Sequence, residues 1–256
     1  MSATATSTAE VALYALRLGD DALILAQRLG EWSSNAPELE EDLALTNIAL
    51  DLLGQARFLL SRAAELEGRG RCEDELAFMR GEREFLNCLL VEQPNGDFAR
   101  TIARQLLFST YQLVLYERLT ASVDEGIAGV AAKAVMEVAY HRDHAVKWTL
   151  RLGDGTSESH ARMQDAIERL WPYTGELFES DALVARLAGA GVAVDPAGLR
   201  EEWERFLAAT LSDATLVVPR GTWRPTGGRR GEHTEAFGHM LAEMQWLHRS
   251  HPGATW

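Results

Sequence analysis

Three side chains with metal-ligand chemistry lie on one predicted helix, at about residues 125–152. Glu137, His141 and His144 follow one another at i, i+4 and i+7, a spacing that brings side chains to one face of a helix. A carboxylate and two imidazoles together suit zinc, iron or manganese. The alternative is a core histidine that hydrogen-bonds to a neighbouring side chain, and we favour it because buried polar groups usually find protein partners.

A di-metal centre in a helical bundle needs more ligands than this helix offers. Such a centre takes a carboxylate from each of two helices and a Glu-x-x-His motif from each of two others. The matching positions of the second predicted helix hold Leu52 and Gln55, and Val138 stands where a glutamate should precede His141. Aliphatic side chains coordinate nothing. The sequence therefore predicts no metal and no catalytic residue, only degenerate positions at Leu52, Gln55, Val138 and His141.

Two further groups of polar residues lie toward the C-terminus. Glu235, His239 and Glu243 are spaced four apart, which predicts either ligands on one helix face or, as we favour, a solvated and partly ion-paired face. Just before them, three arginines are interspersed with glycines: Arg224, Arg229 and Arg230 with Gly227, Gly228 and Gly231. Such a loop is an ordinary surface loop, a phosphate site at a helix N-terminus, or a contact for an acidic partner.

Composition narrows the classes of function. The 256 residues carry a formal charge of −13, which argues against general binding to nucleic acid. Cys72 and Cys88 form neither a metal-type pair nor a disulfide framework, as is usual in a reducing cytoplasm. Residues 1–8 lack the features of a signal peptide and are expected to be a disordered tail. No uninterrupted apolar run reaches the roughly 20 residues that span a bilayer, so no membrane is expected as a partner.

The elements that must position these residues are helices. Helical periodicity dominates and strand alternation is nearly absent. One helix carries an unbroken apolar seam with His141 inside it: Ile127, Ala131, Ala134, Val138, His141, Ala145, Trp148 and Leu152. The expected helices cover about 9–30, 37–68, 82–93, 98–122, 125–152, 157–179, 181–189 and 196–212, with an irregular stretch at 213–232 and a last helix to about 248. Long helices with short connections predict an all-α bundle.

Several long stretches make the chain resemble a known family. These are "LRLGDDALILAQRLGEWSSNAPELEEDLALTNIALDLLGQAR", "LLVEQPNGDFARTIARQ", "GVAVDP" and "TGGRRGEHTEAFGHMLAEMQWL". From about Tyr14 to Trp256 the chain resembles the non-catalytic ferritin-like subunits of bacterial phenylacetyl-CoA epoxidases. The resemblance implies a single ferritin-like helical domain over residues 9–256, with additional C-terminal helices.

The resemblance also implies a role. Leu52 and Gln55 replace a ligand glutamate and a ligand histidine of the related catalytic subunit, and Val138 replaces another glutamate. The chain is thus expected to hold no cofactor, while a ferritin-like di-iron partner epoxidises the aromatic ring of a CoA thioester with O₂, in aerobic phenylacetate catabolism. A flavin and iron–sulfur reductase is a further expected partner. The interface is expected on the first two long helices, and a homodimer is possible when the chain is isolated.

Two other functions stay open on the sequence. One is an active di-iron oxygenase with an atypical ligand set from Glu137, His141, His144 and the last helix. The other is an acyl-CoA-binding module, in which Arg224, Arg229 and Arg230 would contact the CoA phosphates.

Overall fold

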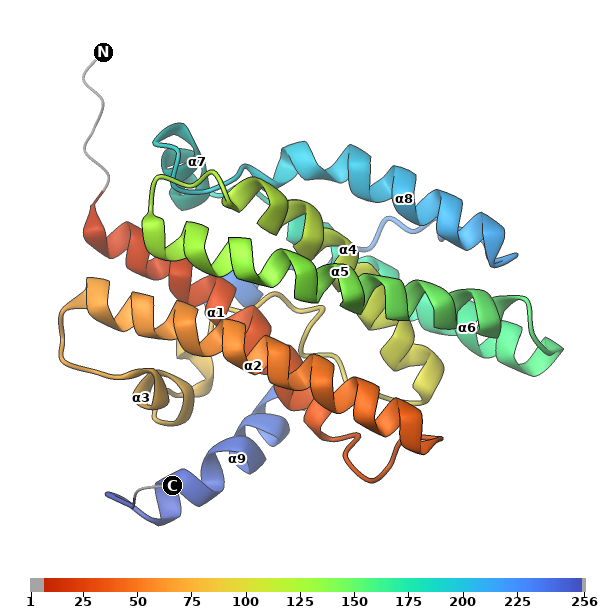
Figure 1. Cartoon of the computed structure of the whole chain (residues 1–256), viewed down its shortest axis with the longest axis horizontal. Coiled ribbons are helices and arrows are strands. Elements are labelled where there is room, and N and C mark those ends of the chain that lie inside the picture. The colour runs from red at the N-terminus through yellow and green to blue at the C-terminus, as the bar shows by residue number, and fades with distance from the viewer. Residues whose placement is uncertain (1–6, 255–256) are drawn as a thin grey trace.

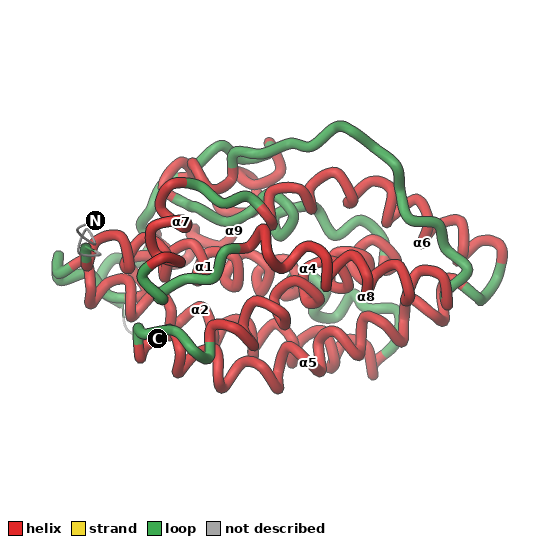
Figure 2. Tube along the Cα trace, turned by 90° about the horizontal axis from the view of Figure 1, so that it is seen from above, coloured by secondary structure: helices red, strands yellow, loops and turns green. Residues whose placement is uncertain are grey.

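The computed structural model describes residues 7–254 and is all-α over that range, as the sequence predicts (Figure 1). Four long helices form the core: α1 (Thr8–Gly30), α2 (Leu39–Glu67), α4 (Phe98–Leu119) and α5 (Glu125–Gly153). The helices α1 and α2 pack as a pair, α4 and α5 form a second pair, and α2 meets α5 across the bundle. In Figure 1 the helices α2 and α5 lie in front. Figure 2, seen from above, shows α2 and α5 toward the lower edge of the picture and α1 and α4 above them.

The remaining elements cover the ends and the back of this bundle. They are α3 (Glu73–Phe78), η1 (Glu82–Glu84), α6 (Ser157–Leu170), η2 (Trp171–Phe178), α7 (Ala182–Gly189), η3 (Pro196–Leu199), α8 (Arg200–Asp213), η4 (Gly228–Arg230) and α9 (Glu235–Ser250). The helices α6 and α8 pack on α4 and α5, whereas α9 contacts α3 and projects from the bundle (Figure 1). One hydrophobic cluster extends from Val11 to Leu241.

Local chemistry explains most helix boundaries. The Ser7 hydroxyl accepts from the Glu10 amide in a capping box, so Ser7 and Thr8, which the sequence predicts in the tail of residues 1–8, belong to the start of α1. Residues 1–6 lie outside the described range. The Asp97 and Asp124 carboxylates cap α4 and α5 in the same way, as N-cap side chains do. The helix expected over 157–179 changes to a 3-10 helix at Trp171, because Pro172 lacks a backbone N–H.

The α-helix predicted over residues 82–93 is wrong. Only Glu82–Glu84 form a 3-10 turn, and the chain then runs irregularly to Asp97. Its amides are taken by buried carboxylates from other elements: Leu86 donates to Asp20, Cys88 to Asp21 and Leu89 to Glu176, at 2.7 to 2.8 Å. These long-range bonds replace the internal bonds that a helix would form.

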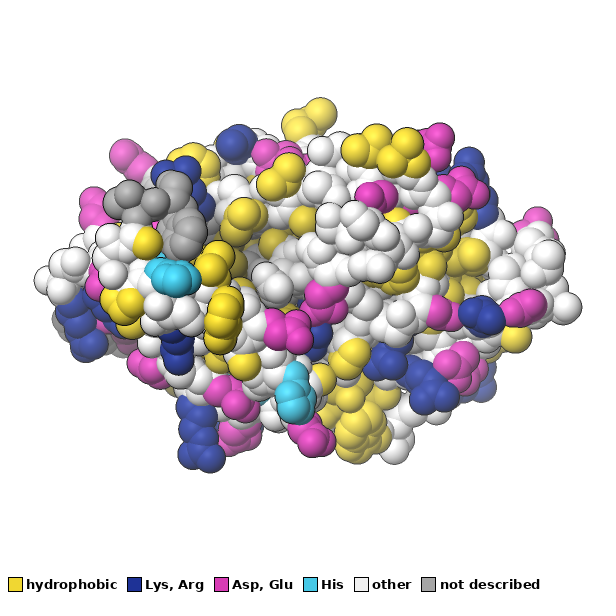
Figure 3. All heavy atoms as spheres, turned by 90° about the horizontal axis from the view of Figure 1, so that it is seen from below, with side chains coloured by type: hydrophobic (Ala, Val, Ile, Leu, Met, Phe, Trp, Pro, Cys, Tyr) yellow, Lys and Arg dark blue, Asp and Glu magenta, His cyan; other side chains and the backbone are white. Residues whose placement is uncertain are grey.

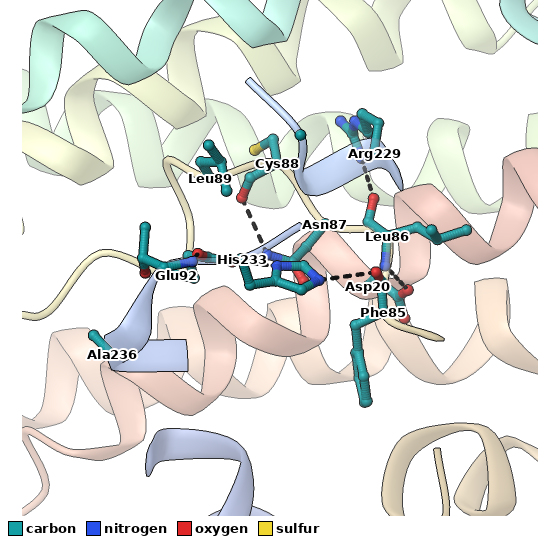
Figure 4. Close-up of polar contacts among 12 residues, drawn as sticks. Asp20, Phe85, Leu86, Asn87, Cys88, Leu89, Glu92, Arg229, His233 and Ala236 are labelled. Carbon is teal, nitrogen blue, oxygen red and sulfur yellow. Dashed lines mark hydrogen bonds and ion pairs between the residues drawn. The ribbon is translucent and has the colours of Figure 1, made fainter. Parts of the chain in front are cut away.

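The arginine–glycine segment before α9 is bound to this irregular loop. Arg229 forms a 2.7 Å ion pair with Asp21 and donates to the Leu86 carbonyl (Figure 4). Gly228 and Gly231 allow the close approach, because a Cβ atom would lie 2.2 Å from the Asn87 oxygen at the first and 2.1 Å from the Arg83 oxygen at the second. Burial is the largest single effect and lowers the pKa of Arg229, but the raising effects, of which the charge of Asp21 is the largest, together outweigh it, so the guanidinium stays charged.

A fully buried histidine–glutamate pair completes the attachment of α9. His233 Nδ1 lies 2.7 Å from Glu92 Oε2, and Nε2 lies 2.9 Å from the Phe85 carbonyl oxygen (Figure 4). Both ring nitrogens face acceptors, so the geometry suits a doubly protonated imidazolium. Burial is the largest single effect and lowers the pKa of His233, but the hydrogen bond and charge of Glu92, the Phe85 carbonyl and the charge of Glu82 together outweigh it, and the net shift is upward from 6.5.

One helix in the described range, α2, is long and apolar enough to cross a membrane by length and composition alone. It packs along α1 and against α5, and core helices of bundles pass the same test, so this is weak evidence for a membrane span.

We predict that Asp21→Asn lowers the free energy of unfolding by about 3 kcal/mol, because the Arg229 charge is then left without its buried partner. Urea unfolding followed by circular dichroism measures this. Asp165→Asn, which breaks an exposed pair with Arg169, is the control and should change stability little. Equal losses in the two variants would contradict the importance of the buried pair.

The stabilisation from His233 should depend on pH. Since its pKa is raised in the folded state, the contribution is complete below the unfolded value and is lost as pH rises through the folded value. Unfolding free energies of the wild type and of His233→Gln, measured from pH 6 to pH 9, should therefore converge as pH increases. A difference that stays constant over this range would show that no proton is involved.

Candidate functional site

The centre of the four-helix core is where a ferritin-like protein holds metal, and here it is lined by aliphatic side chains. Leu52 on α2 and Val138 on α5 are fully buried. Neither side chain has an atom that can donate to a metal ion or accept a proton. The chemistry of this centre therefore depends on the polar groups beside them.

A chain of amides and one carboxylate crosses the centre. Gln112 on α4 donates to Gln55 Oε1 at 3.0 Å, and Gln55 Nε2 donates to Glu137 Oε2 at 3.0 Å. Both ends of the Gln55 amide are thus occupied, and the rotamer is fixed by partners on two other helices. This chain satisfies buried polar groups with protein partners, as a structural core requires.

The three candidate ligands on α5 do not converge. Glu137 bonds to Gln55, His141 Nε2 lies 3.0 Å from Asp51, and His144 Nε2 lies 2.8 Å from Glu41. The structure thus has the alternative arrangement, a core histidine with a neighbouring partner. Burial lowers the pKa of His141 more than Asp51 raises it. Within residues 7–254 no group of three or more His, Cys, Asp or Glu side chains is placed to hold a metal ion.

The helices α1 and α4 add no carboxylate to the centre in the described structure. Asp20 pairs with Arg80 and Asp21 with Arg229, both at the irregular loop. On α4, the Ser109 and Thr110 hydroxyls donate to carbonyl groups of their own helix. On α9, the side chains of Glu235, His239 and Glu243 are exposed, as the solvated-face interpretation predicts.

The three arginines that the sequence suggested as a phosphate or partner contact differ in their exposure. Arg229 is committed to Asp21, with a side chain that is only 17% exposed. Arg224 is exposed, and Arg230 is exposed beside Glu232 at 3.4 Å. The expectation of a flexible surface loop with three available cations is therefore corrected at Arg229, while Arg224 and Arg230 remain accessible.

An exposed apolar surface lies over α2 and α5. Leu50, Leu53 and Phe58 on α2 and Met136 and Tyr140 on α5 are each between 47% and 77% exposed. They lie on the helices that are in front in Figure 1. We call these five residues the α2–α5 face. Large exposed apolar side chains on neighbouring helices are typical of a protein interface where they form one surface.

The other long helices offer less apolar surface. Leu13 is the exposed large apolar residue of α1, which is otherwise mostly buried within the chain. On α9, Trp246 and Leu247 are exposed. Figure 3 shows the underside of the molecule, toward which α9 projects, with hydrophobic side chains interspersed among charged ones. Of the first two long helices, α2 therefore exposes more large apolar side chains than α1.

Comparison with known proteins agrees with this architecture. A family model described as "Phenylacetic acid catabolic protein" matches residues 1–256. The chain belongs to this family. It is also 53% identical over 247 residues to the C subunit of the 1,2-phenylacetyl-CoA epoxidase of Escherichia coli (strain K12), a match that covers 96% of this chain and 99% of that protein. The resemblance to subunits of phenylacetyl-CoA epoxidases is confirmed.

Sequence reasoning missed two buried acidic residues that organise the site's surroundings. Glu92 and Glu176 are at most 2% exposed, and each accepts hydrogen bonds from segments far away in the chain. The available signal was a single acidic residue in an otherwise uncharged stretch, as in "LLVEQP" and "YTGELF". Such a pattern shows that a partner is needed but does not identify it.

We predict that Gln55→Glu destabilises the chain by about 2 kcal/mol at pH 7.5 and by less at pH 5, because it places a second carboxylate against Glu137. One carboxyl then keeps its proton to a higher pH in the folded state, so stability falls as pH rises. Urea unfolding at the two pH values measures this, with Gln55→Leu as the uncharged control. A variant stabilised by added Fe²⁺ would instead indicate a metal site at this position.

Proposed function

We propose that this chain is the structural C subunit of a cytoplasmic phenylacetyl-CoA epoxidase, and that it holds no metal and stabilises a ferritin-like di-iron catalytic subunit. The observation that carries the assignment is the 53% identity to the E. coli protein over nearly the full length of both chains. The reductase and the remaining subunits of the epoxidase are further partners in this proposal.

The bundle centre supports a role without a metal. Two of the positions that would bear ligands hold the buried side chains Leu52 and Val138. Gln55 and Glu137 already satisfy one another, and His141 pairs with Asp51. Building a di-metal site would require several new carboxylates and the loss of these contacts. The chain's contribution to the reaction is therefore to bind and position another subunit.

The α2–α5 face supports a role in binding. Its apolar side chains lie on two of the longest helices of the bundle, and Asp51 and Glu137 lie beside them at the α2–α5 contact. A second ferritin-like subunit with a matching helix pair would cover this face and remove its apolar surface from water. By packing against the partner's iron-bearing helices, the α2–α5 face would fix the distance between those helices.

The two other functions have less support. An oxygenase with an atypical ligand set would need Glu137, His141 and His144 to converge, whereas each contacts a different residue of α2 or its start. A CoA module would use the arginine segment, of which Arg229 is bound to Asp21. Calorimetry of the isolated chain with CoA tests the second function directly.

The test is co-expression of this chain with a ferritin-like di-iron subunit from the same source. We expect a stable complex that contains about two irons per catalytic subunit, while this chain purified alone contains no stoichiometric iron and consumes no O₂ with phenylacetyl-CoA. Leu53→Glu should weaken the complex at least about tenfold, because it places a charge in the buried centre of the interface.

A matched control keeps the interface test specific. Leu247→Glu changes a leucine of similar exposure, 48% against 47% for Leu53, on α9, and should leave the complex intact. Two irons per chain in the isolated protein, or O₂ consumption by it, would overturn the metal-free role. A complex that survives Leu53→Glu and is lost with Leu247→Glu would move the interface to α9.

A further inference from the structure

A small cavity of about 100 Å³ lies between α1, α4 and the segments that cover them, and neither Leu52 nor Val138 lines it. Its walls come from α1, α4, η2, α7, the Val194–Pro196 turn and η4. Leu18, Leu115 and Val184 form an apolar side, and Tyr14 and Tyr111 place their aromatic rings against it. The cavity is too small for a cofactor, but a 150 Å³ apolar cavity holds benzene, so about four to six non-hydrogen atoms fit here.

Some hydrogen-bond donors in the wall have no acceptor, although the wall also holds the carboxylates Glu176, Glu179 and Asp181. The Tyr14 hydroxyl is buried and has no partner at hydrogen-bonding distance, although the Val194 amide is directed toward it. The Tyr111 side chain makes ring contacts with Phe108 and Phe178, and its hydroxyl bonds to no residue in the described range. Arg17 Nε is likewise buried without an acceptor. Burial raises the pKa of both tyrosines, which keeps them protonated.

The charges around the cavity are already balanced. Arg17 pairs with Asp181 at 2.7 Å and Arg229 with Asp21 at 2.7 Å. Glu176 accepts from the backbone amides of Leu89, Gly227 and Arg229. At the rim, Glu179 adds a further negative charge opposite Arg230. A carboxylate ligand would therefore enter next to Glu176, where Arg17 and Arg229 are already paired and the remaining cation, Arg230, is exposed at the rim beside Glu179 and Glu232.

We propose that this cavity binds a small neutral molecule with one oxygen acceptor on a compact apolar body, such as a ketone or an amide. The oxygen would accept from the hydroxyls of Tyr14 and Tyr111, and the apolar body would lie against Leu18 and Leu115. The site is distinct from the α2–α5 face and from the bundle centre, and it does not depend on the role of the chain in an epoxidase.

The test uses the full chain and two pairs of probes matched in size, 2-butanone with propionate and cyclopentanone with butyrate, in calorimetry or ligand-observed NMR. We expect saturable binding of the ketones and none of the carboxylates. Tyr111→Phe removes one hydroxyl and should weaken ketone binding about fivefold, the loss of one hydrogen bond. Val184→Phe fills the cavity and should abolish binding even where Tyr111→Phe alters the fold.

Tyr116→Phe is the matched control, since Tyr116 lies on the same helix and is buried, but it contacts Gln112 and is absent from the cavity wall. Its ketone affinity should equal that of the wild type. No saturable binding of either ketone, which would mean that the cavity holds only water, overturns the proposal. So does tighter binding of the carboxylates, or an affinity that Tyr111→Phe leaves unchanged.

Discussion

The structure depends on buried carboxylates that accept hydrogen bonds from the backbone and from cations. Asp20, Asp21 and Glu176 bind two segments with little regular structure, residues 85–97 and 227–234, to the rest of the fold, and Glu92 joins the two segments to each other. An amide in such a segment has no helical partner, and leaving it buried and unpaired would cost stability. The carboxylates supply the partners, so the bonded amides of these segments are satisfied without helical hydrogen bonds.

This arrangement gives Asp20 and Asp21 of α1 a structural role. In a ferritin-like bundle, an acidic residue in the middle of the first helix is the expected source of a metal-bridging carboxylate. Here both acidic residues serve the loop and the C-terminal segment, with Arg80 and Arg229 as their cations. The bundle centre is left with Leu52, Val138 and an amide chain, which pack and hydrogen-bond but offer a metal little to coordinate.

The proposed binding of a partner rests on a difference between the inner and outer sides of α2 and α5. The polar groups of α2 and α5 are used within the chain, through Gln55, Glu137 and His141. Outward, the two helices present the apolar side chains of the α2–α5 face together with charged residues such as Lys133 and Lys147. The proposed binding of another helix pair uses this exposed apolar surface and leaves the internal hydrogen bonds of the centre intact.

The sequence by itself determined the all-α class, nine of the ten expected segments, the inward direction of His141 and the family, because helical periodicity, capping residues and long matching stretches are local signals. It also identified Leu52 and Val138 as unable to bind a metal. Only the tertiary structure determined that residues 82–93 are largely irregular and that Arg229 pairs with a buried carboxylate. Their partners, Asp20 and Asp21, lie more than 60 residues away, and contacts over such separations leave no periodic pattern in the chain.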